Sequence, residues 1–223
     1  MSRIYDNLQC IRNQIQQSCT KVKRNPNEIL LVAVTKGVSD EQILEASIHG
    51  VEDFGENRVQ EAAEKISKLP SKLKWHMIGH LQTNKTKVAA NLFNMIQSVD
   101  SIKLAERLQA VSTELGKKIE VLLEVNIGKE ETKFGFLEVD VEKTLDQIRK
   151  WNGLKVRGLM TVAPMLNDSE EVRPYFRNMN TLFHRLEGLE ILSMGMSHDY
   201  PIAVEEGATM IRLGQAIFGP RKP

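Results

Sequence analysis

The first residue with the type and position for chemistry is a lysine at the end of an apolar run. Lys36 follows the six apolar residues 29–34 and a threonine. Such a run predicts a buried strand, which would carry Lys36 to its carboxyl end. An amine that is partly removed from water is favoured in its neutral form and can attack a carbonyl. The same position also suits a lysine that extends its ammonium group into solvent, and position alone does not separate the two interpretations.

Small and polar residues follow two predicted strands near the end of the chain. Gly195 and Ser197 lie in one loop, and Gly214 and Gln215 lie in the next, where residues 215–218 could form one helical turn. Glycine lets the backbone approach a phosphate group, and backbone N–H groups donate hydrogen bonds to it. These loops predict a phosphate site of the kind found after the last two strands of many barrels. The alternative is that the glycines only make turns.

Arg212 stands in the last predicted strand, between two apolar residues. Charged side chains are rarely buried unpaired, so an inward-facing arginine predicts a ligand or a carboxylate beside it. An outward-facing arginine would instead pair with a helix. An amine nucleophile, a phosphate cradle and a cationic donor together fit pyridoxal 5′-phosphate: Lys36 would form an imine with its aldehyde, and Arg212 would face its ring nitrogen. Arginine only donates, so that nitrogen would stay unprotonated and the cofactor would be a weak electron sink.

The rest of the sequence predicts the elements that bring these residues together. Apolar strands alternate with helical segments, and eight such units favour an α/β fold in which a parallel sheet closes into a (β/α)8 barrel. A doubly wound open sheet is the alternative. In barrels of this kind, chemistry takes place where the strands end and the following loops begin. The predicted strands are 29–34, 51–54, 74–78, 95–98, 119–125, 154–160, 189–194 and 209–213.

Helical periodicity fills the intervals between the strands and adds a helix ahead of the first one. Ser39, with Gln42 three residues later, predicts a capped helix start. No linker, low-complexity stretch or convincing repeat divides the chain, so residues 1–223 are expected to form one domain. The predicted helices are 1–20, 39–49, 57–69, 85–90, 100–115, 138–150, 169–186 and 200–206.

Composition excludes several classes of function. The chain has 30 Lys+Arg and 29 Asp+Glu, a net charge of +1, and so lacks the electrostatic footprint of a protein that binds duplex nucleic acid. No apolar run is long enough to span a bilayer, and the first segment has no signal-peptide core. The two cysteines, Cys10 and Cys19, are expected to be reduced thiols, which predicts a cytoplasmic protein. Balanced charge without a large apolar stripe is compatible with a monomer.

The sequence also resembles the YggS/PROSC family of pyridoxal phosphate homeostasis proteins, and the resemblance covers essentially the whole chain. The resemblance rests on Ala33-Val34-Thr35-Lys36, Phe54-Gly55-Glu56-Asn57, and residues 75–85, 158–163, 195–199 and 212–219. It implies a barrel similar to the N-terminal domain of alanine racemase, with the cofactor held as a Schiff base on Lys36. It also implies that Asn57 lies beside the cofactor ring and that Arg212 faces its nitrogen.

The resemblance further implies that Ser197, Gly214 and Gln215 hold the phosphate. Family members usually have a small hydroxyl residue where Gln215 stands. A contact from the backbone N–H would survive this change, whereas a hydroxyl contact would not. His198 is a second departure from the family pattern in these loops.

Three more residues at strand ends are candidates for contact with the cofactor: His80, Met160 and Met194. His76 and His80 have the four-residue spacing of a zinc-binding pair on a helix. Here they lie across the end of a strand, where four residues span a much longer distance than one helical turn. No metal site is therefore predicted.

The resemblance implies a binding protein of intracellular vitamin B6 and amino-acid homeostasis, without an established reaction, so no residue is assigned a catalytic role. A pyridoxal phosphate-dependent racemase or decarboxylase is the alternative. A lysine-imine aldolase without cofactor is a further one, but it gives Arg212 no role.

Racemisation needs a second acid–base group on the opposite face of the cofactor, which alanine racemases take from a further domain. The chain ends about ten residues after the last predicted strand. An open cofactor face would suit docking of an apo enzyme that accepts the cofactor.

Overall fold

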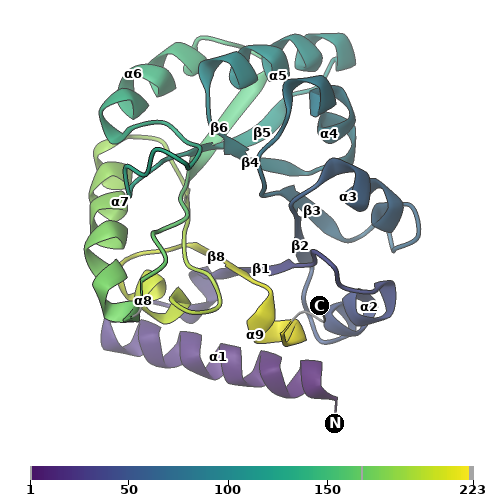
Figure 1. The fold of residues 1–223 in the computed structure, drawn as a ribbon, viewed down its shortest axis with the longest axis vertical. Helices are drawn as coiled ribbons and strands as arrows, with labels where there is room; N and C mark the ends of the chain where they lie inside the picture. The colour runs from purple at the N-terminus through teal and green to yellow at the C-terminus, as the bar shows by residue number, and fades with distance from the viewer. Residues whose placement is uncertain (1, 167, 221–223) are drawn as a thin grey trace.

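The computed structural model describes residues 2–166 and 168–220, and its eight parallel strands close into a barrel in sequential order (Figure 1). The predicted (β/α)8 barrel is therefore confirmed. The open-sheet alternative is wrong, because the first strand pairs with the last, Leu30 opposite Met210. The strands are β1 Leu30–Val34, β2 Asp53–Glu56, β3 Lys74–Met77, β4 Met95–Val99, β5 Ile119–Glu124, β6 Leu154–Met160, β7 Ile191–Ser193 and β8 Met210–Leu213.

Helices surround the barrel, and α1 lies outside it along α8 and α9 (Figure 1). Three short 3₁₀ segments, η1 Pro26–Glu28, η2 Thr83–Lys85 and η3 Ser169–Val172, complete the connections. No helix of the described residues is long and apolar enough to cross a membrane. The α-helices are α1 Arg3–Lys21, α2 Asp40–Ile48, α3 Val59–Ile66, α4 Thr86–Leu92, α5 Ile102–Leu115, α6 Glu138–Arg149, α7 Arg173–Arg185, α8 Tyr200–Glu205 and α9 Gln215–Phe218.

The capping signal in the sequence is present in the structure. The Ser39 hydroxyl accepts the Gln42 N–H, and the Gln42 side chain accepts the Ser39 N–H, which satisfies two N–H groups that the start of α2 would otherwise leave free. The predicted helix over 169–186 is instead divided into η3 and α7. Pro174, which lacks an N–H, stands in the first turn of α7, where no intrahelical acceptor is required.

The second strand lies two residues further along the chain than predicted. It begins at Asp53 because the backbone pairs there with both neighbours, opposite Val32 on β1 and Lys74 on β3. This register brings Gly55 and Glu56 into the strand. Asn57 therefore follows directly after the last residue of β2.

On β4 and β8 the barrel interior changes from apolar to polar along the strand. Side chains alternate between the interior and the surrounding helices with a period of two. Gln97 follows Met95 by two residues on β4, and Arg212 follows Met210 by two on β8, so both occupy inward positions and both are buried. The apolar inner layer consists of Val32, Met95, Leu122, Met160 and Met210.

Candidate functional site

Lys36 comes two residues after the end of β1 and is half-buried. The preceding residue is held firmly: Thr35 is fully buried, and its hydroxyl donates to Glu56 Oε1 at 2.6 Å. This bond joins the segment after β1 to the end of β2. The backbone on the amino side of Lys36 is therefore anchored to the neighbouring strand.

An ion cluster of buried Lys65 and Glu56 with half-buried Glu61 extends this anchor to both sides of Lys36. Lys65 Nζ donates to the Thr35 carbonyl at 2.5 Å, to Glu56 Oε1 at 2.6 Å and to Glu61 Oε1 at 2.7 Å. Glu61 Oε1 also accepts the Gly37 N–H at 2.8 Å. We call these three residues the Lys65 cluster. Through it, α3 fixes the backbone immediately before and immediately after Lys36.

The carboxylates of the Lys65 cluster titrate differently. Burial raises the pKa of Glu56, against the lowering effect of the hydrogen bonds from Lys65 and Thr35. Burial also acts on Glu61, but hydrogen bonds from the Gly37 N–H and Lys65 outweigh it and lower its pKa. Glu56 Oε2 has no hydrogen-bond partner among the described residues. Glu56 is therefore the member of the cluster whose charge depends most on Lys65.

Arg212 points into the barrel, as one of the two sequence interpretations required, and only 4% of its surface is exposed. Its Nη1 donates to Ser193 Oγ at 2.6 Å, and its Nη2 donates to the Thr161 carbonyl at 2.8 Å. Burial lowers the pKa of Arg212 to about 10, partly offset by the carboxylates of Glu124 and Asp199. The guanidinium therefore remains a fixed cation at neutral pH.

A carboxyl group at the end of β5 titrates near neutrality. Burial raises the pKa of Glu124 to about 7, with a further increase from the Asp100 carboxylate and a decrease from Arg212. Glu124 has no ion-pair partner within 4 Å in the part of the chain that the structure describes. Carboxyl groups with such a pKa suit proton transfer at physiological pH.

The loops after β7 and β8 lie side by side and are joined by a hydrogen bond. Ser197 Oγ accepts the Ala216 N–H at 3.2 Å, which leaves the hydroxyl proton of Ser197 available to a ligand. Gly195 has φ +95°, and a Cβ there would lie 2.6 Å from the Ala203 Cβ, so only glycine fits. Asp199 stabilises this loop, because its carboxylate accepts the Met196 N–H at 2.6 Å.

The second of these loops lies next to β1, the strand that carries Lys36. A Cβ on Gly214 would lie 3.4 Å from the Val34 carbonyl oxygen. Gln215 is exposed and begins α9, where the first N–H groups have no intrahelical acceptor. The structure thus brings Ser197, Gly214 and Gln215 together beside the end of β1.

Asn57 and His80 line one cavity of about 360 Å³ beside the ends of β2 and β3. The two loops approach closely: a Cβ on Gly79 would lie 2.5 Å from the Asn57 carbonyl oxygen. The His80 ring pairs through Nδ1 with Asp100 Oδ2 at 2.7 Å, and it stacks on Phe134 with the ring centroids 3.8 Å apart. The side chain of His80 is thus oriented by residues from two other loops.

The two candidate methionines occupy different places. Met160 lies in the inner layer of the barrel, where its fully buried side chain contacts that apolar cluster. Met194 belongs to the main core instead. The preceding residue, Ser193, points inward to Arg212, and the period of two turns Met194 to the other side. In this structure Met194 packs in the main core, and its contact with the cofactor stays a prediction.

Sequence reasoning missed the side chains that hold the site in place. Lys65 lies on a helix whose charged residues read as a solvated face, although Glu61 four residues earlier was a detectable pairing signal. Glu124 was hidden at the end of an apolar strand. Its signal was a single acidic residue at an inward position, two residues after Leu122.

Comparison with known proteins places the chain first in a fold class and then in a family. The family described as "Alanine racemase, N-terminal domain" matches residues 2–222. An alanine racemase from Clostridium difficile 630 superposes with a TM-score of 0.77 at 15% identity, over 98% of this chain and 60% of that chain. The barrel is therefore of the alanine racemase N-terminal type.

Nearer relatives share the full length. The pyridoxal phosphate homeostasis protein of Aquifex aeolicus is 40% identical over 97% of this chain and 98% of its own length. The pyridoxal phosphate homeostasis protein of Escherichia coli K12 is 35% identical over 99% of this chain and 98% of its own length. PipY of Synechococcus elongatus, solved with pyridoxal phosphate bound, has a TM-score of 0.84 at 37% identity, over 97% of this chain and 100% of that chain. The chain belongs to the family of pyridoxal phosphate homeostasis proteins.

Proposed function

We propose that this protein binds pyridoxal 5′-phosphate through a Schiff base on Lys36 and acts in vitamin B6 and amino-acid homeostasis. One observation carries the proposal: a half-buried lysine with braced neighbours, two adjoining glycine-containing loops and a buried arginine gather at the same end of the barrel. Relatives at 35–40% identity are named as homeostasis proteins for this cofactor, and PipY has been solved with it.

The residues at this end of the barrel fit the chemical groups of the cofactor. When bound, pyridoxal phosphate supplies an aldehyde to the amine of Lys36 and a phosphate to the protein's donors. The free hydroxyl proton of Ser197 and the N–H of Gln215 are available to the phosphate, and Gly214 leaves space for it. Arg212, a cation at neutral pH, would donate to the ring nitrogen, and Asn57 and His80, which lie beside the ends of β2 and β3, would contact the ring from that side. Met160, fully buried in the apolar inner layer, would contact the cofactor from the barrel interior.

We propose that the protein carries and delivers the cofactor rather than turning over a substrate. An arginine at the ring nitrogen keeps the ring a weak electron sink, which disfavours carbanion chemistry. Residues 1–223 would then act as one cytoplasmic domain and as a monomer, with an apo enzyme as the acceptor. The net charge of +1 supports neither nucleic acid nor an anionic membrane surface as a partner.

Glu124 supports a second candidate function. A carboxyl group with a pKa of about 7 at the end of β5 is suited to proton transfer, as a racemase or decarboxylase would need. Incubation with single L-amino acids separates the two candidates. Chiral chromatography that shows no change supports the binding role, and multiple turnovers of any one amino acid, lost in Glu124→Gln, support the enzyme.

Covalent attachment is tested by absorption spectroscopy and mass mapping. The protein incubated with pyridoxal phosphate should develop the absorption band of an imine, and borohydride reduction should place the mass increment on the peptide containing Lys36. Lys36→Ala should abolish both signals, whereas Lys150→Ala, at an exposed lysine of the α6 end, should retain them. An increment that persists in Lys36→Ala contradicts the assignment.

A further inference from the structure

The hydrogen bonds of Arg212 do not end at Ser193. The Ser193 hydroxyl accepts from Arg212 Nη1 at 2.6 Å and itself donates to Gln97 Oε1 at 2.7 Å. Ser193 lies on β7 and Gln97 on β4, which are not neighbours in the sheet. This bond therefore crosses the interior of the barrel.

The same chain continues through two more side chains. Gln97 Nε2 lies 3.0 Å from His76 Nδ1, and His76 Nε2 lies 2.9 Å from Asp53 Oδ1. Because the Gln97 oxygen is occupied by the Ser193 hydroxyl, its amide must donate to His76 Nδ1. His76 then carries its proton on Nε2 and donates to Asp53. Every donor points in the same direction, from Arg212 toward Asp53.

Placing these five polar side chains in the barrel interior costs free energy of desolvation. All of them are buried, with exposed fractions of 5% or less. Buried polar groups cost free energy unless they are hydrogen-bonded, and an inner layer of aliphatic side chains would fill the same space without this requirement. The layer beside them, with Val32 and Leu122, is of that apolar kind.

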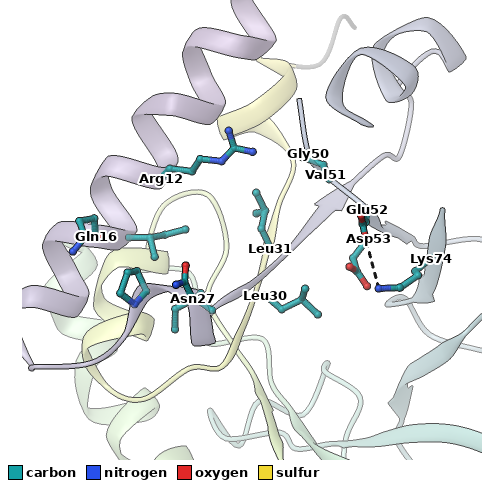
Figure 2. A pocket seen from close by; sticks show the side chains of 13 residues that line it. Arg12, Gln16, Asn27, Leu30, Leu31, Gly50, Val51, Glu52, Asp53 and Lys74 are labelled. Atoms are coloured by element: carbon teal, nitrogen blue, oxygen red, sulfur yellow. Dashed lines mark ion pairs between the residues drawn. The ribbon is translucent and has the colours of Figure 1, made fainter. Parts of the chain in front are cut away.

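The two ends of this hydrogen-bond chain lie on either side of β1, because Asp53 and Arg212 both pair in register with Val32. Arg212 belongs to the site described above, whereas Asp53 lines a cavity of about 490 Å³ at the amino ends of β1 to β3 (Figure 2). Arg12, Asn27 and Lys74 line the same cavity (Figure 2). A carboxylate at this cavity is thus connected by four hydrogen bonds to the arginine at the proposed cofactor site.

We propose that Ser193, Gln97, His76 and Asp53 are positioning residues for Arg212, forming a hydrogen-bond chain of single direction that holds its guanidinium in place across the barrel interior. The proposal rests on the proposed function only in assigning the ring nitrogen as the target of Arg212. The positioning itself is a property of the protein without cofactor.

The first test uses the unaltered protein without cofactor. Nitrogen-15 NMR should show His76 as neutral, with Nε2 protonated and Nδ1 unprotonated, because only this tautomer continues the direction set by Arg212. The signal is identified by its loss in His76→Gln. Protonation at Nδ1 would break the direction and overturn the proposal, whatever the protein does with pyridoxal phosphate.

The second test changes the far end of the chain. Asp53→Leu removes the acceptor of His76, whereas Asp53→Asn retains an oxygen there. In the cofactor-free protein, hydrogen exchange at the Arg212 guanidinium should accelerate about fivefold in Asp53→Leu and recover toward the original rate in Asp53→Asn. Ser112→Ala is the matched control. Ser112 is also buried, and its hydroxyl donates to the Lys117 carbonyl, which is not part of this hydrogen-bond chain.

The readout with cofactor separates positioning from general stability. We expect Asp53→Leu to shift the absorption maximum of bound pyridoxal phosphate and to weaken its binding roughly three- to tenfold, as loss of one buried hydrogen bond would.

Equal guanidinium exchange in Asp53→Leu and Ser112→Ala overturns the proposal. If Asp53→Leu does not fold, Gln97→Glu replaces it, because this change keeps the side-chain volume but removes the donor to His76. Faster hydrogen exchange at the Arg212 guanidinium than in Ser112→Ala then supports the proposal, and equal exchange overturns it. If none of the proteins binds the cofactor, the proposed function fails and the exchange data still decide the positioning role.

Discussion

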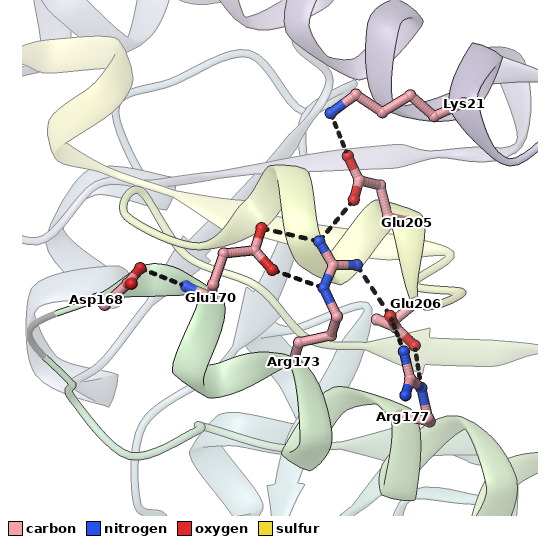
Figure 3. Close-up of polar contacts among 7 residues, drawn as sticks. All are labelled: Lys21, Asp168, Glu170, Arg173, Arg177, Glu205 and Glu206. Carbon is pink, nitrogen blue, oxygen red and sulfur yellow. Dashed lines mark hydrogen bonds and ion pairs between the residues drawn. The ribbon is translucent and has the colours of Figure 1, made fainter.

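Two ion clusters of similar composition occupy different environments in this protein. The Lys65 cluster lies against the barrel, where the side chain of Lys65 is 10% exposed and that of Glu56 is completely buried. The second, which we call the Arg173 cluster, consists of Arg173, Glu170, Glu205 and Glu206 and lies among the surrounding helices (Figure 3). There Arg173 pairs with Glu170, Glu205 and Glu206 at 2.7–2.9 Å, and its own side chain is 25% exposed. Each cluster surrounds one cation with carboxylates.

The two clusters differ in what else their atoms contact. The Lys65 cluster binds backbone atoms on both sides of Lys36. The Arg173 cluster joins η3 and α7 to the end of α8, and Lys21 of α1 reaches Glu205 at its edge (Figure 3). A buried pair adds little net stability, but it is strongly destabilising to break. The Lys65 cluster therefore fixes the backbone around Lys36, whereas the Arg173 cluster joins helices.

Removing the buried cation should have the largest effect. Lys65→Met leaves Glu56 and Glu61 without their shared partner, and we expect the free energy of unfolding to fall by about 3–5 kcal/mol. Urea denaturation measures it, and attachment of pyridoxal phosphate to Lys36 should slow in parallel. Lys68→Met is the control, because Lys68 is exposed and its nearest carboxylate, that of Asp40, is 3.9 Å away. Equal stability of the two variants would refute the distinction between the clusters.

Glu124 is a half-buried acid that, unlike Glu56, has no lysine within ion-pair distance among the described residues. Its folded pKa of about 7 lies above the ordinary 4.5, so between these values the folded protein binds more protons than the unfolded chain. The free energy of unfolding should therefore fall as pH rises through this range, by up to about 3 kcal/mol. Urea denaturation from pH 5 to 8 should show that Glu124→Gln removes this decline. A parallel pH dependence in both proteins would contradict the raised pKa.

Breaking the outer cluster should cost less and depend on salt. In Arg173→Met we expect a loss of about 1 kcal/mol, because solvent screens these partly exposed pairs although they form a network. The difference from the unaltered protein should shrink at 1 M NaCl, whereas that of Lys65→Met should persist. The absorption spectrum with pyridoxal phosphate should not change. A shifted spectrum would mean that the outer cluster also acts on the site.

The edge of the Arg173 cluster should contribute least. Lys21 is 65% exposed, so Lys21→Met should change the free energy of unfolding by less than about 0.5 kcal/mol despite the 2.7 Å distance to Glu205. Thermal denaturation of this variant beside Arg173→Met tests whether exposure or distance governs the effect. A loss in Lys21→Met as large as that in Arg173→Met would show that distance does.

The sequence was sufficient to predict the barrel and the residues at its strand ends. Alternation of apolar strands with helices determines the fold class, and Lys36, Arg212 and Gly214 follow from their positions at those ends. The supporting contacts could not be predicted in this way. Whether Lys65 meets Thr35 depends on how α3 crosses β1 and β2, which is a matter of packing rather than of local pattern.

Strand register limits sequence reasoning in two further places. Met194 ends an apolar run, but the inward position on that strand belongs to Ser193, so a contact of Met194 with the cofactor stays a prediction. The polar residues Asp53, His76 and Gln97 lie on three different strands, and their alignment depends on the stagger of the barrel. Sequence spacing within one strand does not contain that information.

The pairing of β1 with β8 has a consequence for how the protein is made. Lys36 follows the first strand and Gly214 the last, so the two sides of the site are separated by almost the whole chain and meet only when the barrel closes. Pairing over about 180 residues carries a large loop-closure entropy and is slow. In refolding experiments, the imine absorption should therefore appear with the final kinetic phase. A chain that still lacks β8 would be unable to sequester the cofactor, and occupancy would report that the barrel has closed.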